Sequence, residues 1–69
     1  MKLYGQEVPQ SVIDAANAAM VGRFTFKDVE LPAARECIAH SGRVADRLLQ
    51  LARKAGKIRY EGGYWHEVV

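Results

Sequence analysis

The chain has 69 residues, of which 49% are hydrophobic and 26% are charged, and its formal net charge is +2. This length allows one small domain with a modest core, and the composition is that of a folded chain. Cys37 is the single cysteine, so no internal disulfide can form, and the two histidines are too few for a Cys/His zinc site. No apolar run approaches the roughly 18 residues of a membrane span, and the start MKLYGQE lacks the apolar segment of a signal peptide. The sequence therefore predicts a cytoplasmic protein without membrane contact.

The N-terminal third contains one predicted helix. Residues 1–7 show no clear pattern and could form a short arm or a frayed end. Val8-Pro9-Gln10-Ser11 is typical of a helix start, and it is followed by an apolar stripe at helical spacing, formed by Val12, Ile13, Ala16, Ala19 and Met20. Gly22 is the expected end of this helix. The β-forming residues 23–26 could then add a short strand, near Phe24, to a sheet formed elsewhere.

The segment from Thr25 to Gly42 allows two interpretations. Thr25 and Asp28 suggest a helix cap with a helix starting near Phe26, yet Pro32 would break a helix that runs through it. The helix could instead begin at Pro32. Both versions place a short helix before a tight turn at residues 39–42, as in helix-turn-helix units. Cys37 is expected to be a small buried hydrophobic residue of this segment.

A basic amphipathic helix is predicted over residues 42–55. Ser41 is a candidate N-cap and Gly56 a candidate C-terminal stop. One stripe is apolar and consists of Val44, Ala45, Leu48, Leu49, Leu51, Ala52 and Ala55. A second stripe at the same spacing is cationic and hydrogen-bonding, and it consists of Arg43, Arg47, Gln50 and Lys54.

A β-hairpin is predicted after Gly56, where the periodicity changes from 3.6 to 2. KIRY and YWHEV are rich in β-formers and flank Glu61-Gly62-Gly63. A two-residue turn would pair Tyr60 with Trp65, whereas a three-residue turn with a bulge would pair Tyr60 with Tyr64. In both registers Ile58 and Trp65 face inward, and the expected core consists of Leu48, Leu51, Ile58 and Trp65.

Positive charge is concentrated in the second half of the chain. Residues 1–34 have a net charge of −1, residues 35–59 have +5 and the last ten residues have −2. The excess therefore lies on the segment that contains the basic helix and the first strand of the hairpin.

The order helix, short β segment, helix, turn, basic helix and hairpin resembles the winged helix-turn-helix domain. The most specific match is LLQLARKAGKIRYEGGYW, which resembles the end of a recognition helix and the following wing in bacterial and phage regulators. The resemblance covers about residues 9–68 and implies an α+β fold of three helices with a C-terminal wing. The chain departs from the family at Glu30-Leu31-Pro32, where the second helix of the family is usually uninterrupted.

The resemblance implies sequence-specific binding of double-stranded DNA by a small transcriptional regulator or accessory factor. The helix at 42–55 would enter the major groove and the wing at 57–68 would lie on the backbone. Arg and Gln side chains can fork onto guanine and adenine edges, so Arg43, Arg47 and Gln50 are suited to base contacts. Phosphate contacts are expected from Lys54, Lys57 and Arg59, and Ser41 completes the candidate set. Asp46 is expected to pair with Arg43 or Arg47.

Other functions are less well supported by the sequence. No catalytic residue set, cofactor motif, metal site or small-molecule site is indicated, so the chain is predicted not to be an enzyme. A homodimer would supply affinity that one small module lacks. The alternative from another class is a winged helix that binds a protein partner through Tyr60, Tyr64 and the apolar residues of the first helix.

Overall fold

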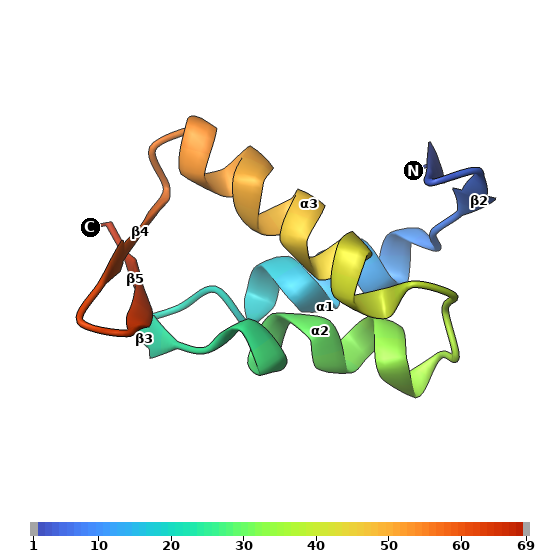
Figure 1. The fold of residues 1–69 in the computed structure, drawn as a ribbon, viewed down its shortest axis with the longest axis horizontal. Coiled ribbons are helices and arrows are strands. Elements are labelled where there is room, and N and C mark those ends of the chain that lie inside the picture. The colour runs from blue at the N-terminus through green and yellow to red at the C-terminus, as the bar shows by residue number, and fades with distance from the viewer. Residues whose placement is uncertain (1, 69) are drawn as a thin grey trace.

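The computed structural model describes residues 2–68 and shows an α+β fold with three helices and two small antiparallel sheets (Figure 1). The helices form the middle of a body measuring 31 × 20 × 17 Å, with a small sheet at each end of its long axis. In chain order the elements are β1 (Lys2–Leu3), β2 (Gln6–Glu7), α1 (Gln10–Ala18), β3 (Arg23–Phe24), α2 (Phe26–Arg35), α3 (Ser41–Lys54), β4 (Ile58–Glu61) and β5 (Tyr64–Glu67).

The N-terminal residues form a β-hairpin, which the sequence did not predict. Strands β1 and β2 pair with Lys2 opposite Glu7, and the turn between them holds Tyr4 and Gly5 at φ 52° and 78°. The side-chain amide of Gln6 donates a hydrogen bond to the carbonyl oxygen of Ala39, in the loop between α2 and α3. This contact ties the hairpin to the rest of the molecule, so residues 2–7 are neither a free arm nor frayed.

Helix α1 is shorter than the glycine rule predicts. It ends at Ala18 with Ala19 as its cap, so the prediction that Gly22 ends this helix is wrong. Gly22 instead has a φ of 57° and leads into β3. Its N–H donates to Oε1 of Glu67 at 3.2 Å, and its carbonyl accepts from the N–H of Glu67 at 2.8 Å. The glycine thus helps to dock β3 beside the hairpin.

Helix α2 begins at Phe26 and runs through Pro32, so the interpretation with a helix start at Pro32 is wrong. Thr25 and Asp28 form a reciprocal capping box in which each side chain accepts from the other residue's N–H, at 3.4 and 2.9 Å. An internal proline removes one hydrogen bond and costs about 3 kcal/mol. The capping box and the burial of Val29 and Ala33 on the core offset part of that cost.

The end of α2 places Cys37 in a left-handed backbone conformation. Cys37 has a φ of 54°, and the N–H of Ile38 reaches back to the carbonyl of Ala33 at 3.0 Å, as in a Schellman cap. The thiol is exposed and free. Cys37 is therefore not the buried hydrophobic residue that the sequence suggested, because Ile38 is the residue here that packs against the core.

We expect Cys37→Gly to raise the free energy of unfolding by about 0.5–1 kcal/mol, because a left-handed conformation costs most residues about 1–2 kcal/mol and glycine little. The matched reverse change is Gly56→Ala at the end of α3. Gly56 has a φ of 75° and an added Cβ there would meet no atom within 4 Å, so any loss arises from the backbone alone. Urea unfolding of both variants should show shifts of opposite sign, and a destabilised Cys37→Gly protein would refute this explanation.

Helix α3 spans Ser41–Lys54, within one residue of the prediction at each end. Its N-cap is His40, with a φ of 56° and no side-chain cap, so the assignment of Ser41 as the N-cap is wrong. At the other end Gly56 is the predicted stop, and the N–H of Lys57 bonds to the carbonyl of Ala52 at 3.0 Å. The buried face consists of Val44, Ala45, Leu48, Leu49 and Ala52.

The three-stranded sheet has the order β3-β5-β4. Tyr60 pairs with Trp65 and Glu61 with Tyr64 around a Gly62-Gly63 turn, which confirms the two-residue alternative. Both glycines have positive φ, at 61° and 84°, as a type I′ turn requires. The predicted third strand near Phe24 is also confirmed, since Phe24 pairs with Trp65.

The core is entirely apolar, since no polar or charged side chain among the described residues is buried. Two of the four expected core residues, Leu48 and Ile58, are buried at 4% exposure each. Trp65 is half-buried and packs against the core, whereas Leu51 is half-buried and faces a groove. The expectation for Leu51 is thus wrong, and Leu49 is the fully buried leucine of α3. None of the helices in residues 2–68 is long and apolar enough to cross a membrane.

Candidate nucleic-acid interface

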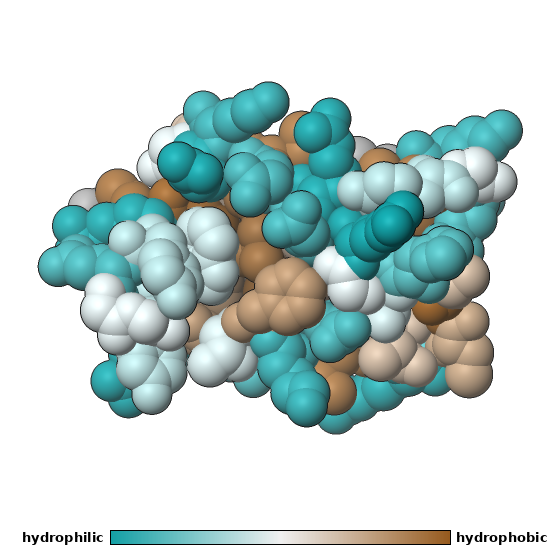
Figure 2. All heavy atoms as spheres, in the orientation of Figure 1, coloured by the Kyte–Doolittle hydropathy of each residue, from teal (hydrophilic) through white to brown (hydrophobic). Residues whose placement is uncertain are grey.

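The outer face of α3 carries the cationic stripe expected from the sequence. Arg43, Arg47 and Lys54 are exposed, and Gln50 is half-buried. The apolar residues of α3 are buried on its opposite side, so the helix is anchored by one face and presents the other to solvent. Figure 2 shows hydrophilic side chains along the upper edge of the molecule, where α3 lies in Figure 1. At 1.5 Å per residue this 14-residue helix is about 21 Å long.

Two residues near the start of α3 differ from their expected roles. Ser41 is half-buried, and its hydroxyl donates to Oε2 of Glu30 on α2 at 3.1 Å. Gly42 lies close to the same carboxylate, because a Cβ at this position would be 3.3 Å from Oε2 of Glu30. The hydroxyl of Ser41 therefore joins two helices. Asp46 makes no ion pair within residues 2–68, so its expected pairing with Arg43 or Arg47 is not formed.

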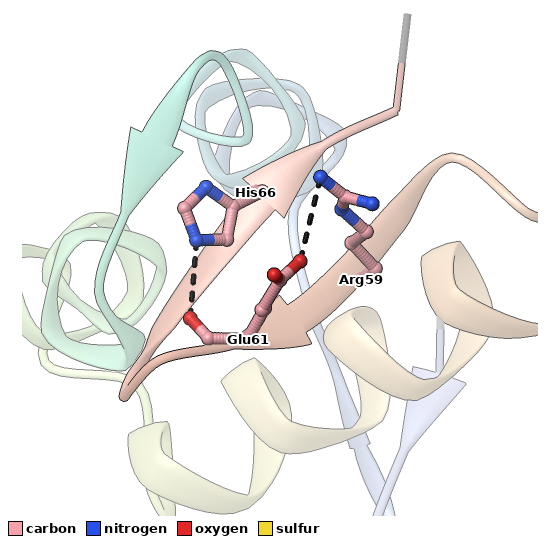
Figure 3. A network of polar contacts seen from close by, with 3 residues as sticks. All are labelled: Arg59, Glu61 and His66. Carbon is pink, nitrogen blue, oxygen red and sulfur yellow. Dashed lines mark hydrogen bonds and ion pairs between the residues drawn. The ribbon is translucent and has the colours of Figure 1, made fainter.

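The cations of the hairpin are exposed, and one of them is already paired. Lys57 precedes β4 and is exposed. Arg59 Nη2 lies 3.4 Å from Oε2 of Glu61, and both side chains are about two-thirds exposed, at 66% and 65%. His66 Nε2 lies 3.1 Å from the carbonyl oxygen of the same glutamate (Figure 3). An exposed ion pair is weak, but Glu61 reduces the positive potential that Arg59 offers to an anion.

Strand β3 adds an arginine that the sequence reasoning missed. Arg23 pairs with His66 across the sheet, and its guanidinium lies 4.7 Å from the centre of the Tyr64 ring. Because side chains alternate along strands, Arg23, Tyr64, His66 and Arg59 share the outer face of the sheet. Arg23 belongs to the acidic half of the chain, and only the long-range pairing of β3 with β5 brings it here.

A groove lies between α3 and the inner face of the hairpin. It has a volume of about 620 Å³ and is lined by Gln50, Arg53, Ile58, Arg59, Tyr60 and Trp65; we call it the hairpin groove. Tyr60 and Trp65 meet edge to face, with ring centres 5.1 Å apart. Arg53 was not among the predicted site residues. Its position three residues after Gln50 puts both on one side of the helix, and this spacing was the available signal.

A second groove, of about 560 Å³, lies at the other side of the C-terminal end of α3, and we call it the apolar groove. Its apolar lining includes Met20, Val21, Leu51, Ala55 and Val68. Val21 and Val68 are 57% and 49% exposed, which leaves aliphatic surface in contact with water.

Metal-ligating side chains are dispersed over the molecule. Within residues 2–68 no three His, Cys, Asp or Glu side chains lie together so that they could hold a metal ion. Comparisons of the chain with protein-family models, with curated proteins and with solved structures found no match.

Proposed function

We propose that the protein is a winged helix that binds double-stranded DNA in a sequence-specific manner, with α3 in the major groove and the β4–β5 hairpin as the wing. The observation that carries the proposal is the element order. Helix, strand, helix, helix and hairpin follow one another, and the strand between the first two helices pairs with the last strand of the hairpin. This arrangement places the basic helix and the hairpin next to each other.

The division of contacts follows from position on the two elements. Arg43 and Arg47 lie in the first half of α3 and Gln50 follows three residues later, on the face whose side chains would reach base edges in the major groove. The phosphate contacts would come from the end of α3 and from the proposed wing. They are assigned to Lys54 at the end of α3, Lys57 just before β4 and Arg59 on β4. Ser41 is not one of the proposed DNA contacts, because its hydroxyl already donates a hydrogen bond to Glu30.

The proposed role is that of a small transcriptional regulator or accessory factor, either cytoplasmic in a bacterium or encoded by a phage. A module of this size is suited to that role. One small interface gives modest affinity, so the proposal includes binding as a homodimer to two half-sites. The apolar groove, with its exposed valines, offers surface that such an association could cover.

The proposal is tested by an electrophoretic shift combined with selection from a pool of randomised duplexes. A sequence-specific protein should enrich one motif over successive rounds, and an inverted repeat in that motif would indicate a dimer. A pool that is shifted but never enriched would show non-specific binding, and a pool that is not shifted at all would refute DNA binding.

Glu61 gives a prediction of its own. We expect Glu61→Gln to strengthen binding to any duplex several-fold, because Arg59 loses its paired carboxylate and the wing loses one negative charge near the phosphates. Fluorescence anisotropy with a random-sequence duplex measures the change. The control is Glu7→Gln on the N-terminal β2, which removes an equal charge far from the wing. Equal effects of both variants would mean that net charge, and not the wing, sets affinity.

The alternative proposal is a winged helix that binds a protein partner. The observation in its favour is exposed apolar surface: Tyr60 and Tyr64 are 62% and 41% exposed, and Val21 is 57% exposed just after α1. In this case the partner would cover aliphatic and aromatic side chains, and its affinity would depend little on salt.

A further inference from the structure

We propose that the hairpin groove holds one unpaired nucleotide at a junction between duplex and single-stranded DNA, with the base on the ring of Tyr60 and its phosphate at Arg53. This inference rests on the proposed function, because α3 would hold the duplex side of the junction. It goes beyond that function by assigning a preferred DNA form and a site that reads it.

The first observation concerns the three tyrosines, two of which already have a cation over the ring. The guanidinium of Arg23 lies 4.7 Å from the centre of the Tyr64 ring, and that of Arg43 lies 6.0 Å from the centre of the Tyr4 ring. Tyr60 has no such partner within residues 2–68, and its ring contact there is with Trp65, edge to face. At 62% exposure it is also the most exposed of the three. Its ring is therefore open to a flat ligand.

The second observation is the charge opposite that ring. Arg53 lines the same groove from α3, is exposed, and forms no ion pair in the described part of the chain. Arg59 lines it from β4 but is paired with Glu61. The groove thus offers an aromatic face on one wall and an uncompensated guanidinium on the other. An aromatic base joined to a phosphate matches both walls, and the groove volume of about 620 Å³ is within the range of small-ligand sites.

A base inside a duplex cannot stack on the Tyr60 ring, whereas an unpaired base can. A base inside a duplex is stacked on both faces, whereas an unpaired base presents a free face, and aromatic side chains bind such bases with little sequence preference. The half-buried amide of Gln50 also lines the groove and can donate to or accept from a base edge. The strand that leaves the duplex would pass between α3 and the wing.

The test compares two DNAs with the same duplex, one blunt and one with a short single-stranded extension that carries 2-aminopurine at its first unpaired position. We expect the extended DNA, for one of the two strand polarities, to bind roughly tenfold more tightly, since stacking of a base on one aromatic residue is worth about 5- to 150-fold in affinity. The fluorescence of 2-aminopurine should fall on binding because the base stacks. Tyr60→Leu should abolish the preference and the quenching but leave binding to the blunt duplex unchanged.

The matched control is Tyr64→Leu, which removes an exposed tyrosine from the opposite face of the sheet. This variant should keep the preference for the extended DNA, whereas Arg53→Gln should reduce it. Equal affinity of the wild-type protein for both DNAs, of either polarity, would overturn the inference and leave the proposed function intact. A preference that survives in Tyr60→Leu would overturn the assigned site, and failure to bind either DNA would refute the inference together with the proposed function.

Discussion

Leu49→Ala should leave most of the protein unfolded at room temperature. Leu49 is 1% exposed and is the largest of the fully buried side chains. Truncation of a buried leucine costs about 2–5 kcal/mol, and a single core of this size supplies only about 3–5 kcal/mol. Circular dichroism should show loss of most of the helical signal, or a midpoint in urea near zero.

The control for Leu49 is Leu31→Ala on α2. Leu31 is 39% exposed, so the same chemical change removes much less buried surface and should cost below about 1 kcal/mol. Leu51, which is half-buried beside the apolar groove, should fall between the two. Similar losses from Leu49→Ala and Leu31→Ala would contradict the core described above.

Arg47→Ala is the second change with a large expected effect. Arg47 is exposed on the first half of α3, where the proposal places base contacts. Loss of a bidentate contact to one base costs about 1–3 kcal/mol and relaxes preference at that position. Binding to the selected site should therefore weaken about 5- to 150-fold, whereas binding to random duplex should change much less.

Arg59→Ala is the comparison for Arg47. Arg59 lies on β4, where the proposal places a phosphate contact that would add affinity without reading sequence. Its substitution should weaken binding to selected and random DNA alike, and the existing pair with Glu61 should make the loss small. Equal losses from both variants on every DNA would show non-specific binding, and no loss from either would favour the protein-binding alternative.

The local elements of the second half were predictable because their signals are local. The 3.6-residue stripe and Gly56 placed α3 within one residue at each end, and the Gly62-Gly63 turn allowed the observed pairing of Tyr60 with Trp65. The apolar pattern could not predict which leucine of α3 is the most buried, since Leu48, Leu49 and Leu51 all belong to one broad apolar stripe. Which of them is buried depends on how α1 and α2 pack against the helix.

The remaining errors arose from competing local signals in α2 and from contacts between residues far apart in the chain. Pro32 is tolerated inside α2 because the Thr25–Asp28 capping box and core packing favour the helix. Cys37 is exposed because it occupies the left-handed position of a helix cap, a place where glycine is usual. The hairpin of residues 2–7 is held by a hydrogen bond to the loop before α3, and Arg23 reaches the β4–β5 hairpin by pairing with His66, 43 residues further along the chain. The contact of Gln6 with Ala39 and the pairing of Arg23 with His66 join residues far apart in the chain, so a short window of sequence could not predict them.

The most direct measurement of the central proposal is the salt dependence of duplex binding, followed by fluorescence anisotropy. If Lys54, Lys57 and Arg59 meet phosphates, the logarithm of the binding constant should fall linearly with the logarithm of salt concentration, with a slope of about −2.7. Affinity should then drop about 40-fold between roughly 50 and 200 mM salt. Binding that does not change with salt, or no binding to duplex DNA at low salt, would contradict the proposal that α3 and the wing form a DNA-binding surface.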